Sequence, residues 1–214
     1  MLTKISVFKK KFYTHFLPPF CSICTKKKGY ICLSCYDKLS FSISKTSINK
    51  HEHFYLSSYT KPLEKLIHSI KFDYYKKALI PLQKKVSTVL QNSILAKHYD
   101  AWIPIPSHPL KDYQRGYNII EKIFKPYFDL QNIPIKHILK RSKNTKALAT
   151  LSKEKRIKTL KGSITIHTKT PFQAKNVLLV DDIVTTQTTM KECIKVLNRH
   201  TCIKTLDCLS LIKT

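Results

Sequence analysis

The sequence contains few acidic residues, few arginines and few glycines. Its 214 residues include 39 basic and 13 acidic side chains, which gives a formal net charge of +26. Only four basic residues are arginine, so the clusters that would make bidentate contacts with phosphates or bases are missing. The charge therefore favours a polyanionic partner without distinguishing DNA, RNA and lipid, and a lysine-rich composition accounts for part of it.

Long apolar runs are also missing. No stretch approaches the ~20 apolar residues that span a bilayer, and no secretory signal follows the N-terminus, so we expect a cytoplasmic location. One segment near the N-terminus is amphipathic, because apolar residues recur there at helical spacing among lysines. Such a helix either packs on its own domain or lies peripherally on the inner face of the cytoplasmic membrane. The apolar positions are Leu2, Ile5, Phe8, Phe12 and Phe16.

Length and composition predict an α/β protein with a small appended module. An apolar content of 43% is typical of a globular chain. We divide the chain into residues 1–49, which hold the amphipathic segment, a cysteine-rich segment and a Ser/Lys-rich linker over 41–49, and a larger domain over 50–214. In the larger domain the pattern predicts strands and helices at Phe54–Tyr59, Pro62–Lys71, Ala78–Ala96 and Trp102–Pro106.

Four cysteines near the N-terminus have the spacing of a metal site. Cys21 and Cys24 form one C-x-x-C pair, and Cys32 and Cys35 form a second. Two such pairs bring four thiolates to one tetrahedral ion, and disulfides are disfavoured in a cytosolic protein. The spacing therefore predicts a structural Zn²⁺ site, with an iron–sulfur centre or a redox dithiol as the alternatives.

Other cysteines and histidines fit ordinary structural positions. Cys193, Cys202 and Cys208 have no mutual ligand spacing and are predicted to be small core residues. His51 and His53 flank Glu52, but the expected linker nearby makes them solvated residues rather than metal ligands.

The most informative segment runs from Asn176 to Thr189. Its apolar run, Val177–Val180, is long enough for a buried parallel strand, and it ends directly in Asp181 and Asp182. Two adjacent carboxylates repel each other unless a cation or ribose hydroxyl groups compensate. The carboxyl end of a strand is also where an open α/β sheet binds its ligand, so the acid pair is a candidate binding site.

Small hydroxylated residues follow the acid pair. Thr185, Thr186, Thr188 and Thr189 are expected to form a turn into a helix, whose free N–H groups and dipole attract a phosphate. We call residues Thr185–Thr189 the threonine loop.

The order of aliphatic residues, two acids and a threonine loop resembles the 5-phosphoribosyl-1-pyrophosphate (PRPP) signature of type I phosphoribosyltransferases. The resemblance implies that the acids hold the ribose hydroxyls with the help of Mg²⁺ and that the loop amides hold the 5′-phosphate. Gln187 departs from the pattern, because the family has a very small residue there; its side chain is expected to crowd the phosphate or oppose a turn with positive φ. The implied PRPP-binding residues are Asp181, Asp182, Ile183, Val184, Thr185, Thr186, Gln187, Thr188 and Thr189.

Further motifs resemble the ComF family over essentially the whole chain. They are Leu17-Pro-Pro-Phe-Cys-x-x-Cys, Ile70-Lys71, Ile103-Pro-Ile-Pro-Ser-His and Arg115-Gly-Tyr-Asn, in the family's order. Gly116 in the last motif predicts a turn. The expected fold is therefore an open parallel sheet of the type I phosphoribosyltransferase kind, with an N-terminal Cys₄ zinc module.

The same resemblance implies roles for residues outside the acid pair. Ser107 and His108 would belong to a pyrophosphate loop, with a plain surface histidine as the alternative for His108. Lys71 and Arg115 would join the acid pair as catalytic groups, by neutralising the leaving pyrophosphate. Residues 144–164 resemble a flap, although Leu148 stands where relatives often carry glutamine.

Several functions are consistent with these features. ComF proteins act in bacterial DNA uptake, so the resemblance implies handling of single-stranded DNA on the cytoplasmic side during natural transformation, with a helicase or channel as partner. The segment Lys71–Lys77, which combines lysines with aromatic rings, adds modest support, with tyrosines packed at a helix end as the alternative. The alternatives are a phosphoribosyltransferase of nucleobase salvage and a zinc-dependent adaptor that uses the fold as a scaffold.

Overall fold

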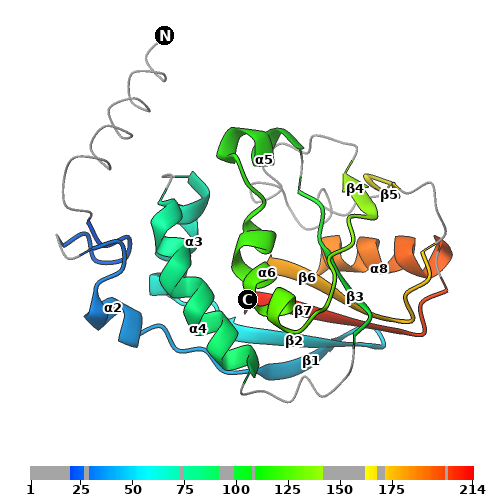
Figure 1. Ribbon diagram of the computed structural model, residues 1–214, viewed down its shortest axis with the longest axis horizontal. Helices are drawn as coiled ribbons and strands as arrows, with labels where there is room; N and C mark the ends of the chain where they lie inside the picture. The colour runs from blue at the N-terminus through cyan, green and yellow to red at the C-terminus, as the bar shows by residue number, and fades with distance from the viewer. Residues whose placement is uncertain are drawn as a thin grey trace, which may run out of the picture.

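A mostly parallel sheet organises the chain (Figure 1). The computed structural model describes residues 20–26, 29–72, 75–91, 99–107, 109–141, 162–167, 172–200 and 202–214. Within these ranges the central sheet has the order β1-β2-β7-β6-β3, in which β1 runs antiparallel to β2 and the other neighbours are parallel. The strands are β1 (Ser44–Ile48), β2 (His51–Ser58), β3 (Ala101–Pro104), β6 (Asn176–Val184) and β7 (Thr205–Lys213).

Strand β6 confirms the predicted buried strand. Val177–Val180 are fully buried, and β6 pairs in parallel with β3 on one side and β7 on the other. A strand covered on both faces needs a continuous apolar run, which explains the absence of polar–apolar alternation in this part of the sequence. The acid pair therefore lies near the carboxyl end of an interior strand.

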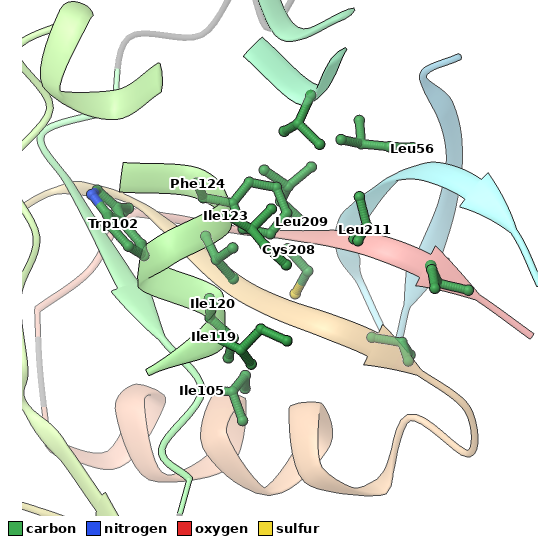
Figure 2. Packing of buried hydrophobic residues seen from close by; sticks show 14 of the residues in the cluster. Leu56, Trp102, Ile105, Ile119, Ile120, Ile123, Phe124, Cys208, Leu209 and Leu211 are labelled. Carbon is green, nitrogen blue, oxygen red and sulfur yellow. The ribbon is translucent and has the colours of Figure 1, made fainter. Parts of the chain in front are cut away.

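Helices cover both faces of the sheet. Figure 2 shows α6 and α8 on opposite sides of β6. None of the helices in the described ranges combines the length and the apolar character needed to cross a bilayer. The helical segments are α2 (Leu33–Asp37), α3 (Lys61–Phe72), the 3₁₀ turn η1 (Lys76–Ala78), α4 (Leu79–Gln91), α5 (Pro109–Arg115), α6 (Ile119–Leu130) and α8 (Thr188–His200).

Local sequence explains how α6 begins and how it accommodates a proline. The Asn118 side chain accepts a hydrogen bond from the Glu121 N–H at 3.2 Å and so caps the helix. Pro126 has no N–H to give to the carbonyl of Lys122 four residues earlier. The Gln83 amide from α4 donates to that carbonyl instead, at 2.5 Å, which also ties α4 to α6.

Part of the core lies between the sheet and α6. The Trp102 ring from β3 stacks on Phe128 with centroids 4.9 Å apart, and both side chains are fully buried. Figure 2 shows Ile119, Ile120 and Ile123 of α6 pointing toward the strands. This packing fixes the start of α6 over the carboxyl ends of β3 and β6.

Two expectations for the region before α3 are wrong. The predicted linker over 41–49 contains β1, which pairs with β2 from Ser44 opposite Tyr55 to Ile48 opposite His51. Polar residues suffice there because β1 is an edge strand with one partner. His53 is not solvated but fully buried, with Nε2 2.9 Å from the Ser210 hydroxyl, and burial lowers its pKa to about 4. The division of the chain at 49/50 stays a prediction.

The other elements largely follow the prediction. Helix α3 matches Pro62–Lys71 closely, β2 begins three residues before the predicted Phe54, and α4 covers the described part of the predicted Ala78–Ala96 helix. Among the remaining cysteines, Cys193 and Cys208 are buried as expected, whereas Cys202 is exposed just before β7. The amphipathic segment over residues 2–16 lies outside the described residues.

A second, two-stranded sheet lies beside the larger one. It pairs β4 (Leu139–Arg141) with β5 (Ile164–Ile166) in antiparallel fashion, and β5 packs near α8. These strands bracket the residues that resemble a flap. Leu148 and most of the predicted flap lie outside the described residues.

Candidate functional site

A cavity of about 410 Å³ opens at the carboxyl ends of β3 and β6. Side chains of both signs line it: the acid pair on one wall and three basic residues around it. The predicted residues Lys71, Ser107, Arg115 and Thr189 come together here with the acid pair, from four separate elements or loops. The full lining is Lys71, Phe72, Ile105, Pro106, Ser107, Gln114, Arg115, Asn118, Ile119, Ile120, Arg141, Asp181, Asp182 and Thr189.

The two carboxylates differ in their surroundings. Neighbouring side chains on a strand point to opposite faces, so the members of the pair meet different helices. Asp182 is 8% exposed and forms an ion pair with Lys71 of α3, Oδ2 to Nζ 2.5 Å. Asp181 accepts a hydrogen bond from the Asp182 N–H at 2.8 Å and lies near Cys193 of α8, whose thiol pKa its charge helps to raise.

The carboxyl of Asp181 has a strongly raised pKa. Burial and, after it, the neighbouring Asp182 charge together raise the pKa of its carboxyl to about 7. The Asp182 N–H and the Lys71 ammonium act in the opposite direction but do not cancel the rise. The physical cause is the one expected for adjacent carboxyls in a partly desolvated site. A cation or a hydroxyl donor at this position would stabilise the charged form.

Arg141 is a member of the site that the sequence did not reveal. It ends β4 and lines the cavity, and the charge of Asp181 supports the cationic form of its guanidinium. Burial acts against this and lowers the Arg141 pKa overall. In the sequence, the only feature that could have indicated Arg141 as a site residue is that it is one of four arginines. No local pattern indicates that the β4–β5 hairpin would bring it beside β6.

The threonine loop forms a small cradle at the start of α8. A hollow of about 30 Å³ lies within it, next to Asp181. The Lys191 N–H donates to the Gln187 carbonyl at 2.9 Å, so α8 begins here, and the N–H groups of its first turn have no partners within the helix. The Thr186 and Thr188 hydroxyls are 3.0 Å apart. The loop thus has the geometry of an anion site at a helix N-terminus.

Gln187 occupies a backbone position that favours glycine. Its φ is +58°, in the left-handed region, where a side chain costs on the order of 1 kcal/mol. Gln187 therefore does not prevent the positive-φ turn, which the chain adopts. Crowding of a phosphate by its side chain stays a prediction. The conformational cost of Gln187 is confined to this one backbone position of the threonine loop.

The wall opposite the threonine loop is built on the end of α3. The Arg115 Nε donates to the Lys71 carbonyl at 3.3 Å, and the Tyr117 hydroxyl donates to the Ile70 carbonyl at 2.8 Å. These bonds satisfy carbonyls that the helix itself leaves free. Gly116 between the two donors has φ +78°, which confirms the predicted turn. His108 lies outside the described residues.

The four N-terminal cysteines gather at metal-binding distance. The Sγ atoms of Cys21, Cys24, Cys32 and Cys35 all lie within 4.8 Å of one another. Cys24 and Cys32 are 3.7 Å apart, close to the edge of about 3.8 Å that a tetrahedron of Zn–S bonds of about 2.3 Å requires. The donor set and its geometry fit a structural metal. Zinc as its identity stays a prediction.

The cysteine module packs directly on α3 and η1. The Ser69 hydroxyl of α3 donates to the Ser22 carbonyl at 3.5 Å, and Tyr30 meets Tyr75 edge to face at 6.0 Å. The Lys85 ammonium of α4 donates to the Tyr36 carbonyl at 2.6 Å and lies over the Tyr36 ring. The module therefore rests on the same helix whose last residues line the cavity.

Sequence similarity relates the chain to a known protein. No family model matches the chain. Competence protein F of Haemophilus influenzae is 27% identical over 188 residues, which cover 85% of this chain and 79% of that protein. The chain is a homologue of competence protein F. This finding confirms the resemblance to the ComF family read from the sequence motifs.

The solved structures that match the chain include adenine phosphoribosyltransferases. The enzyme from Thermoanaerobacter pseudethanolicus is 13% identical, with a TM-score of 0.39, and the match covers 67% of this chain and 85% of that one. A second adenine phosphoribosyltransferase is 9% identical, with a TM-score of 0.41, over 84% and 89% of the two chains. These likenesses are remote, so the α/β assignment of this ComF homologue rests on its own strand order.

The cysteine module should require its metal. We expect about one zinc per chain, and replacement of a ligand in Cys24→Ser should abolish zinc retention and lower the melting temperature, because three of the cysteines belong to the continuous core. Metal analysis and thermal unfolding of purified protein would measure both. Cys202→Ser, at an exposed cysteine away from the cluster, is the matched control. Full zinc content in Cys24→Ser, or iron in its place, would contradict the assignment.

Proposed function

We propose that this ComF homologue binds PRPP together with Mg²⁺ in the cavity and acts in DNA uptake. One observation carries the ligand assignment: the two adjacent carboxylates near the end of β6 line a cavity that adjoins the small hollow of the threonine loop, and Asp181 and Thr189 line both. A ligand that satisfies both must offer hydroxyl groups beside a terminal phosphate. A phosphorylated sugar has this arrangement.

The charges around the acid pair favour a ligand with a second anionic group. Lys71, Arg115 and Arg141 line the cavity, against Asp181 and Asp182. With the 5′-phosphate on the loop amides and the ribose hydroxyls at the acid pair, a pyrophosphate on C1 would lie toward Ser107, Lys71 and Arg115. Lys71 would then exchange part of its ion pair with Asp182 for the ligand. PRPP provides all three groups.

The same residues suit a magnesium ion. Mg²⁺ prefers oxygen ligands and binds proteins through one or two carboxylates together with substrate phosphates. Asp181 and Asp182 would hold it beside the ribose. When bound, it supplies positive charge that stabilises a leaving pyrophosphate. The chain's own contribution would be to orient the sugar, exclude water with the apolar Ile105 and Ile119, and neutralise the leaving group through Lys71 and Arg115.

The role in DNA uptake is supported by the name of the relative and by the charge of the chain. The name of competence protein F refers to competence. A formal net charge of +26 favours binding to a polyanion. We propose that the chain handles single-stranded DNA on the cytoplasmic side, with a helicase or channel as partner. Tyr75 packs against Tyr30, the Lys76 ammonium lies over the Tyr117 ring, and the Lys77 ammonium lies over the Tyr30 ring. These side chains therefore have contacts within the fold in the absence of DNA.

The ligand proposal predicts a loss of binding when the acid pair is neutralised. In calorimetric titrations with Mg²⁺ and PRPP, Asp181→Asn/Asp182→Asn should bind at least about tenfold more weakly than wild type, because hydrogen bonds to a charged group are lost. Asp129→Asn is the control, since it removes an exposed carboxylate of α6 that only pairs with Lys125. Equal affinity of the double variant and wild type would exclude the site.

Affinity should also rise with pH. The Asp181 carboxyl, with a pKa near 7, holds a proton at pH 6 that must leave when a cation or ribose hydroxyls bind. Binding should strengthen between pH 6 and pH 8, by up to about tenfold per unit below the pKa. The ligand's own phosphate titrates near pH 6, so the comparison is with Asp181→Asn, whose pH dependence should be smaller. Identical pH profiles would contradict this role of Asp181.

Single-stranded DNA binding should depend steeply on salt. We expect a labelled oligonucleotide to bind at low salt, with log K falling linearly against log salt concentration at about −0.7 per phosphate contact. Fluorescence anisotropy between 50 and 200 mM salt would measure the slope. No binding at the lowest salt would remove the DNA proposal while leaving the PRPP proposal intact.

A further inference from the structure

One carboxylate just outside the cavity joins several residues that line it. Asp112 of α5 accepts hydrogen bonds through Oδ2 from the Ser107 hydroxyl and from the Asn118 amide, the latter at 3.1 Å. Its other oxygen, Oδ1, is 3.8 Å from the Arg115 guanidinium. Asp112 does not line the cavity itself, whereas its three partners do. It therefore acts on the cavity only through them.

The three partners come from different segments of the chain. Ser107 lies in the loop after β3, Arg115 ends α5, and Asn118 caps α6. Asn118 uses its carbonyl for the Glu121 N–H and its amide for Asp112, so its orientation is fully determined. Asp112 thus ties the loop to a rigid helix start.

Arg115 extends this linkage to α3. Its Nε donates to the Lys71 carbonyl, while its terminal nitrogen faces Asp112. A long cationic side chain loses rotamer freedom when it is held at both sites before a ligand arrives. Ligand binding then does not have to order this side chain, which favours affinity.

The negative charge of Asp112 has the opposite effect on anion binding. A carboxylate next to an anion-binding wall repels the anion and should weaken its binding. The Oδ1 atom is buried and has no hydrogen-bond partner among the described residues, which is itself unfavourable. Asp112 keeps a negative charge here despite the repulsion and the buried oxygen. We therefore expect it to have a function that compensates for both costs.

We propose that Asp112 is a positioning residue that holds Ser107 and Arg115 in place for the pyrophosphate end of the ligand. The inference rests on the proposed function, because only the proposed PRPP orientation directs the pyrophosphate toward Ser107 and Arg115. Asp112 would therefore govern discrimination between ribose phosphates that carry a pyrophosphate on C1 and those that do not.

The test compares two ligands on one protein. With Mg²⁺ present, Asp112→Asn should bind PRPP at least about tenfold more weakly than wild type, whereas its affinity for ribose 5-phosphate should stay within about twofold. Ser107→Ala should show the same selective loss on a smaller scale, and the double variant should lose less than the product of the two single effects. Asp129→Asn removes an equal charge from an exposed site and should change neither affinity.

Each other outcome argues against the proposal. Tighter PRPP binding by Asp112→Asn would mean that simple repulsion dominates. Equal losses for both ligands would mean that Asp112 only maintains the fold, and the ribose 5-phosphate affinity provides this internal check. If wild type binds neither ligand, the proposed function fails and the inference with it. If wild type binds both and Asp112→Asn matches it, the inference alone fails.

Discussion

The ion pair between Lys71 and Asp182 joins the end of α3 to the end of β6, and the geometry of the cavity depends on it. Both side chains are mostly buried, so removal of either partner would leave a charge without compensation, at a cost of about 3–5 kcal/mol. Both members of the pair act on Asp181: after burial, the Asp182 charge raises the pKa of the Asp181 carboxyl, and the Lys71 ammonium lowers it. A single contact thus joins α3 to the acid pair and holds a lysine at the cavity wall.

Helix α3 connects the two chemical centres of the molecule. The cysteine module rests on it through Ser69, and the cavity begins at its last residues, where Tyr117 and Arg115 bind its terminal carbonyls. A helix transmits position because its backbone is rigid over its whole length. The cysteine module therefore packs on the same helix whose end lines the cavity.

Much of the fold and part of the site could be predicted from the sequence. Val177–Val180 predicted an interior parallel strand because only a strand buried on both faces is apolar throughout. The cysteine spacing predicted a four-thiol cluster because the C-x-x-C geometry is local. The linker over 41–49 was wrong for the converse reason: an edge strand such as β1 can be polar, so composition does not distinguish it from a loop.

The sequence by itself determined which residues can do chemistry: the acid pair, the threonine loop and the four cysteines, whose function depends on neighbours close along the chain. Only the tertiary structure decided which of them share a cavity. Arg141 reaches Asp181 through a hairpin, and Lys71 at the end of α3 reaches Asp182 of β6. Such meetings depend on how separate elements pack, and no local pattern encodes them because packing is set by the whole core.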